Sequence, residues 1–236
     1  MTFSSDGTSH RSINYDARHV NYKAESYSED NVAATEQCTR LIGVHSSQDG
    51  TSEEAVKAWK KLFADIANTY NQSPLRKLTG NLLRVVDIFI KLTGMHSDHC
   101  AKEKKSAVLM EKEKMSATHQ SLGEDVVLEK SNQELLPHFI QAREQMIKAS
   151  GGLNKWDQLS ETAKADQLAG MMEKLVIKLG KESFNALKDN EKQVLKLFIW
   201  VGCGCHKDLN TVRGGNDVMM KWWKANDTGG NNQCEP

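Results

Sequence analysis

The sequence predicts an α/β protein that is mostly helical and opens with a short antiparallel β-meander. β-forming residues separated by polar ones dominate roughly the first 45 residues, a spacing typical of strands. Beyond residue 51, apolar residues recur at spacings of three and four, which indicates amphipathic helices. Only 3 prolines and 4 tyrosines occur in 236 residues, which argues against a β-sandwich rich in turns.

Three strands are expected over residues 2–5, 12–23 and 40–44. The polar stretch 28–37 between the second and third strands reads as a loop. Strands that follow one another at such short distances usually pair as an antiparallel meander.

A first helix is expected after Thr51, because a hydroxyl cap followed by Glu53 and Glu54 is a helix start signal. Its apolar face consists of Val56, Trp59, Phe63, Ile66 and Tyr70, and the segment 71–74 ends it. Further helices are expected over 78–92 (ending at Gly94), 102–115 (a solvated Lys/Glu face), 135–149, 156–180 and 218–224. The apolar run 197–201 fits either a buried strand or a helix end.

Composition narrows the class of protein. Lys and Arg total 31, as do Asp and Glu, so zero net charge excludes a binder of nucleic acid by bulk charge. Leu, Ile, Val and Phe make up about a fifth of the chain, so we expect a thin core. The odd count of 5 cysteines favours free thiols in a reducing compartment. Without a secretory signal or a run long enough to span a membrane, we expect an intracellular protein, nuclear or cytoplasmic, with no membrane partner.

A first motif, Asp6-Gly7, follows the opening strand. A carboxylate at a strand end suits a hard cation such as Mg²⁺. The dipeptide is equally a common hairpin turn.

A second motif, residues 96–100, places two histidines, a carboxylate and a cysteine before Lys102, Lys104 and Lys105. Asp98 is a candidate metal carboxylate, with the lysines placed for phosphates. Ser97 or Asp98 also suits the N-cap of a helix that begins near residue 101, and the two readings are compatible.

A third motif, Cys203-x-x-His206, has the residue types of a zinc site. A structural zinc site needs four ligands, so His96, His99 or Cys100 would have to complete it. The alternative is a packed cysteine pair beside a histidine. A nucleophilic Cys205 is less favoured.

Taken in order, these motifs resemble the ribonuclease H-like core of DDE-type transposases, in particular the hAT-like group. Residues 5–9 look like that group's first acidic element without its tryptophan, and Asp98 looks like its second acid. Cys203-x-x-His206 with Leu209-Asn210 looks like its Cys-x-x-His element. The stretches 95–105 and 202–215 also resemble transposon-derived proteins of mushroom-forming fungi. The resemblance implies a truncated core: an N-terminal half over 1–100, a helical insertion over 101–196, a return strand with the Cys-x-x-His segment over 197–226, and a disordered tail over 227–236.

The resemblance implies Mg²⁺-dependent cleavage or transfer of DNA strands, with Asp6 and Asp98 as catalytic metal ligands. Contacts with the DNA backbone would come from Lys102, Lys104, Lys105, Lys207 and Arg213. The family's late glutamate has no good match, since Glu235 lies in the tail, so we expect a remnant or domesticated core that is inactive. The alternative is a non-enzymatic helical binding or scaffold module, stabilised by zinc at Cys203 and His206. A decayed gene fragment is a third reading.

Overall fold

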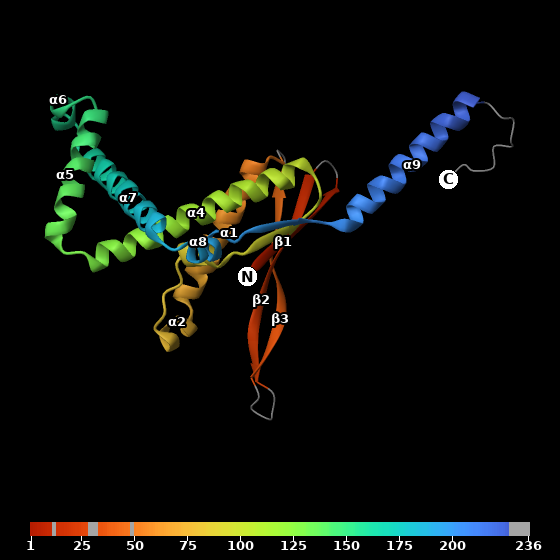
Figure 1. The fold of residues 1–236 in the computed structure, drawn as a ribbon, viewed down its shortest axis with the longest axis horizontal. Helices are drawn as coiled ribbons and strands as arrows, with labels where there is room; N and C mark the ends of the chain where they lie inside the picture. Colours follow the sequence, from red (N-terminus) through yellow and green to blue (C-terminus); the bar gives the residue numbers. More distant parts are fainter. Residues whose placement is uncertain (11–12, 28–32, 48–49, 227–236) are drawn as a thin grey trace.

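The structure, a computed structural model, describes residues 1–10, 13–27, 33–47 and 50–226, and it is a mixed α/β fold (Figure 1). Its strands are β1 (Thr2–His10), β2 (Ile13–Tyr27), β3 (Ala33–Ser47), β4 (Gly94–Ser97) and β5 (Ile199–Gly202). Its helices are α1 (Ser52–Gln72), α2 (Pro74–Thr79), α3 (Val85–Lys91), α4 (Ala101–Glu129), α5 (Asn132–Ala149), α6 (Leu153–Asp157), α7 (Glu161–Ala186), α8 (Asp189–Lys196) and α9 (Gly204–Asn226).

The strands form one mixed sheet in the order β3-β2-β1-β4-β5. β1, β2 and β3 are the antiparallel meander that the sequence predicts, and β4 and β5 join in parallel beside β1. The strands are longer than expected. Residues 33–37, assigned to a loop from their polarity, belong to β3 because they pair with residues 23–27 of β2. The rest of that expected loop, residues 28–32, lies outside the described residues.

The expected helix over 78–92 is wrong in its bounds. Pro74 opens the short helix α2, and Gly80, at φ 70°, ends it. The chain re-enters a helix only at α3, and Gly94 then begins strand β4 instead of ending a helix. A four-residue strand is too short to show a periodicity. Its partners, β1 and β5, lie far away in the sequence.

Helices α1, α3 and α4 cover one face of the sheet and enclose the main core. The Thr51 hydroxyl accepts a hydrogen bond from the amide of Glu54 (3.2 Å), as a cap should. Behind this cap, Trp59 and Phe63 of α1 contact Phe3 of β1 in edge-to-face geometry. The expected apolar face of α1 is therefore confirmed except at Tyr70, which lies outside the core. This face attaches the meander to the helices.

Helix α4 is not the purely solvated helix that its Lys/Glu content predicts. Lys114 is buried, and its ammonium donates to the carbonyls of Ile90 and Leu92 at the end of α3. Burial lowers the pKa of the Lys114 side chain. The lysine thus satisfies two carbonyls that the last turn of α3 leaves without intrahelical partners.

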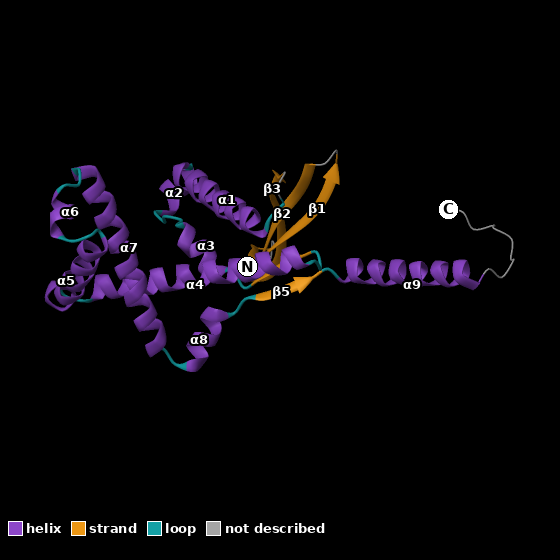
Figure 2. Ribbon diagram, turned by 90° about the horizontal axis from the view of Figure 1, so that it is seen from above, coloured by secondary structure: helices purple, strands orange, loops and turns teal. Residues whose placement is uncertain are grey.

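Helices α5, α6 and α7 form a separate helical region at the far end of α4 (Figures 1 and 2). α7 crosses α4 at a glycine contact. A methyl group on Gly180 would overlap the carbonyl oxygen of His119, and one on Gly123 would overlap that of Val176. The two helix backbones can approach this closely only without these side chains.

The open choice at 197–201 is settled in favour of a strand, since residues 199–202 form β5. This strand is not the buried one expected, because it lies at the edge of the sheet and Ile199 and Val201 are exposed. Helix α9 follows β5 and runs from 204 to 226, far longer than the expected 218–224 (Figure 1). The expected disordered tail, 227–236, lies outside the described residues. In the part of the chain that the structure describes, no helix has the length and apolarity needed to cross a membrane.

We predict that Gly180→Ala destabilises the protein by about 1–3 kcal/mol or more, because the added methyl forces two helix backbones apart. Gly170→Ala, on the same helix with open space around it, is the matched control. It should stabilise the fold by about 1 kcal/mol through helix propensity. Chemical denaturation measures both changes, and equal effects would contradict the close α4–α7 contact.

Candidate functional site

The carboxyl end of β4 lies beside the middle of β1, with which β4 pairs in parallel at the centre of the sheet. From β1 the chain turns to β2 on one side, whereas β4 lies on the other side. In open α/β sheets, ligands bind outside the carboxyl ends of strands where the strand order reverses in this way. This edge is therefore the first place to look for a site.

A pocket of about 200 Å³ lies at this edge, between the sheet and helices α1 and α4. Its polar lining comes from three parts of the sequence that the fold brings together. These residues are Ser5 of β1, Tyr15 and Asp16 of β2, and Asp98, Cys100, Lys102, Glu103 and Ser106 from the end of β4 and the start of α4.

Three carboxylates line this pocket, and we call them the acidic cluster: Asp16, Asp98 and Glu103. Asp16 stands opposite Gly7 in the β1–β2 ladder, and Asp98 directly follows β4. Glu103 lies in the first turn of α4. Burial raises the pKa of Glu103, Lys102 opposes this rise, and the charges of Asp16 and Asp98 add to it. The Glu103 carboxylate therefore lies where water solvates it poorly, close to the charges of Asp16 and Asp98.

A buried arginine stands beside the acidic cluster. The Arg18 side chain is only 2% exposed, and its Nε donates to Asp16 Oδ2 at 3.1 Å. Its guanidinium also lies 4.8 Å from the ring centroid of Trp59, in a cation–π contact. Burial lowers the pKa of Arg18, and Asp16 opposes that shift. Asp16 is thereby fixed in place at the pocket wall.

Asp6, the expected first metal ligand, does not line the pocket. Ser5 and Gly7 do, and alternation along β1 directs Asp6, which is exposed, to the opposite face of the sheet. Asp98, the expected second ligand, does line it. Sequence reasoning missed Asp16 and Glu103, although the antiparallel register opposite Asp6-Gly7 could have indicated Asp16.

In the second motif, the N-cap of α4 is neither of the two residues expected from the sequence, Ser97 and Asp98. Ser97 is buried within β4, where its hydroxyl accepts from Trp200 Nε1 at 3.0 Å, and Cys100 holds the N-cap position of α4. The His99 ring stacks on Trp200 with centroids 5.3 Å apart. It also covers Gly202, where a methyl group would overlap it.

This packing brings the second and third motifs together. Cys203 follows Gly202, and its amide donates to the carbonyl of Ser97 at 2.8 Å. His99 and Cys203 are thus neighbours in space, although about a hundred residues separate them. The side chain of His206, the other expected zinc ligand, lies outside what the structure describes.

The expected phosphate-binding cations are spread over two elements. Lys102 lines the pocket and Lys104 is exposed on the same turn, whereas Lys105 forms an ion pair with Glu53 at 2.7 Å. Arg213 is exposed on α9, about 13 Å along that helix from its first residue. The side chain of Lys207 is outside the described part of the structure.

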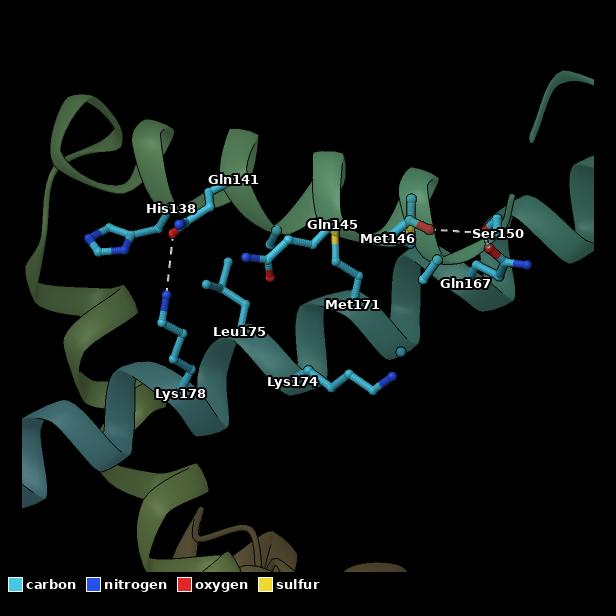
Figure 3. Close-up of a pocket in the computed structure, with 13 residues that line it drawn as sticks. His138, Gln141, Gln145, Met146, Ser150, Gln167, Met171, Lys174, Leu175 and Lys178 are labelled. Atoms are coloured by element: carbon cyan, nitrogen blue, oxygen red, sulfur yellow. Dashed lines mark hydrogen bonds between the residues drawn. The ribbon is translucent and has the colours of Figure 1, made fainter. Parts of the chain in front are cut away.

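A larger cavity of about 600 Å³ lies between α5 and α7 (Figure 3). Lys178 donates to Gln141 across it at 3.3 Å, and Met171 and Leu175 lie on its α7 side. Among the described residues that line it, none is a carboxylate or a cysteine. This cavity is larger than the acidic pocket, but the described residues of its lining offer no carboxylate or thiol that could bind a cation or act in catalysis.

The donor chemistry of the acidic pocket fits a hard cation, since carboxylate oxygens are what Mg²⁺ prefers. Within residues 1–10, 13–27, 33–47 and 50–226, no three His, Cys, Asp or Glu side chains are arranged closely enough to hold a metal. Mg²⁺ is commonly held by only one or two carboxylates, with water and substrate phosphates as its other ligands. Asp98 with Asp16 or Glu103 would supply that smaller number of carboxylates.

In comparisons with known proteins, the chain matches no family model, no curated protein and no solved structure.

We predict that Glu103→Gln stabilises the protein at pH 7. The raised pKa of Glu103 means that the folded state binds its proton more tightly than the unfolded state does. Stability is therefore lost as pH rises from about 4.5 through the folded pKa, and glutamine removes that loss. Thermal unfolding at pH 4 and pH 7 measures the change in stability. The variant should unfold at a higher temperature than the parent at pH 7 and at the same temperature at pH 4. The exposed Glu111→Gln on the same helix is the control, and an equal gain there would refute the explanation.

Proposed function

We propose that the acidic pocket binds a divalent cation and the phosphate backbone of DNA, in a core of the ribonuclease H-like, DDE-transposase type. The observation that carries the proposal is the acidic cluster at the carboxyl end of β4, beside the middle of β1. Further support comes from the antiparallel meander and from the place of Asp98, an acid directly after a strand parallel to β1.

In this proposal each residue has its own task. Asp98 and Asp16 hold the cation, which when bound would polarise the scissile phosphate. Arg18 holds the Asp16 carboxylate in its orientation through its Nε contact. Lys102, at the pocket wall, and Lys104, beside it, neutralise phosphates on either side of the one that is cleaved.

Glu103 has the character of a proton-handling group. Its raised pKa brings its protonation closer to neutral pH than that of an ordinary carboxyl. The Ser97 side chain partly offsets this rise in the pKa. It is suited to take up or return a proton as the phosphate bond is broken.

We predict that Asp98→Asn and Asp16→Asn each reduce Mg²⁺-dependent nicking of supercoiled DNA to background. Both changes keep the size of the side chain and remove its charge. Asp125→Asn, an exposed carboxylate on α4, should leave nicking intact. Asp6→Asn distinguishes the site proposed from the structure, with Asp16, from the one expected from the sequence, with Asp6. Only if Asp6 is a metal ligand should this variant also be inactive. Nicking that survives both Asp98→Asn and Asp16→Asn would refute the proposed site.

A zinc-stabilised binding module is the second candidate, and the contact of His99 with Gly202 beside Cys203 favours it. We predict that purified protein then carries one zinc per chain by elemental analysis, and that Cys203→Ser and His99→Ala each remove it. Cys38→Ser, a thiol of β3, is the control, because it should leave the metal content unchanged. Protein without zinc that unfolds at the same temperature with and without chelator would eliminate this candidate.

A further inference from the structure

Helix α9 projects away from the rest of the molecule in both views (Figures 1 and 2). Every residue from 211 to 226 is exposed. Large apolar side chains are among them, including Val212 at 70%, Trp222 at 57% and Trp223 at 50% exposed. A surface of this kind on a single chain usually marks a site of association.

The sequence of α9 is poorly suited to a helix that stands alone in water. Gly214 and Gly215 occupy its middle, and each costs about 1 kcal/mol relative to alanine. Most helical stability in proteins comes from packing of an amphipathic face, which here has no counterpart in the described chain. The helix therefore needs a surface to pack against.

Four apolar residues and one asparagine of α9 follow a heptad pattern. Leu209, Val212, Asn216, Met219 and Trp223 succeed one another at spacings of three, four, three and four. They fall on one side of the helix, which we call the heptad face, at the positions named a and d in coiled coils. Val218, also 67% exposed, lies on the other side.

We propose that the heptad face pairs in parallel with the heptad face of a second copy of this chain. Asn216 occupies a central a position, where a buried asparagine sets the register and favours two strands. In a parallel pair, the g position of one helix faces the next e position of its partner. These positions are Asp208 and Arg213, so two Asp–Arg pairs flank the interface and support this orientation.

The charged residues also favour the parallel arrangement over the antiparallel one. In an antiparallel pair, g faces g and e faces e, so the Asp–Arg pairs are lost. The pair is short, about three heptads, and contains two glycines. Association should therefore be weak and concentration-dependent. It involves only α9 and is independent of the acidic pocket.

Sedimentation equilibrium of the full chain over a range of concentrations tests the proposal. We expect the mass to rise from 26.4 kDa toward twice that value, with helix content rising in parallel. Val212→Asp should abolish dimers, whereas Val218→Asp, equally exposed but off the heptad face, should leave them. Both variants should unfold at the same temperature as the parent at low concentration, since α9 lies outside the core.

A charge swap tests the orientation. Asp208→Arg and Arg213→Asp should each weaken the dimer at least tenfold, and the double variant should restore it. A chain that stays monomeric at all concentrations would overturn the proposal. This holds whether α9 is then found to pack on the sheet of its own chain or to bind anionic lipid vesicles. So would dimers that Val212→Asp and Val218→Asp affect equally.

Discussion

The burial of Phe3 is the contact on which the rest of the structure depends. Its ring lies 4.6 Å from that of Trp59 in α1 and 6.3 Å from that of Phe198, just before β5. A single side chain of β1 thus contacts both the first helix, α1, and the segment between helix α8 and strand β5. It stands level with Met95 in the β1–β4 ladder, so the same contact fixes the register of the two central strands. That register in turn brings Ser5 and Gly7 to the pocket that Asp98 also lines.

Local features of the fold could be predicted from the sequence, and features that depend on distant pairing could not. The cap and apolar spacing of α1 lie within one segment, so its start and its buried face follow from a local pattern. Strand β4 has only four residues, and it exists because β1 and β5 flank it. The crossing of α4 and α7 rests on Gly123 and Gly180, which are isolated residues until the helices meet.

The site divides in the same way. Asp98 stands out in the sequence because a histidine on each side and lysines close behind make an unusual cluster. Asp16 and Glu103 carry no such local mark, and the β1–β2 register and the first turn of α4 bring them to the pocket. Asp6 stands out in the sequence as part of an Asp-Gly dipeptide, but alternation along β1 places it on the face away from the pocket. A residue in a strand is a candidate ligand only if its side chain lies on the same face of the sheet as the site.

The electrostatics of the pocket suit a cation better than an anion. Asp16, Asp98 and Glu103 contribute three negative charges, against which Arg18 and Lys102 stand as two positive ones. Arg18 is already paired with Asp16, and the pocket lining still holds more carboxylates than cations. Raising the pKa of Glu103 costs folding stability, and a bound cation would reverse that cost. Zero net charge of the whole chain hides this local imbalance.

The two proposals meet at the start of α9. The amide of Cys203 bonds to the carbonyl of Ser97, so α9 begins beside the end of β4, next to the acidic pocket. In a parallel pair both helices begin at the same end, and the two pockets would therefore lie at that end. An antiparallel pair would separate them by the length of the helix, about 34 Å for its 23 residues. Under the proposed function, the orientation of α9 would decide whether two acidic pockets can reach one stretch of DNA. Asp208, Arg213 and Asn216 are the residues that would set this orientation.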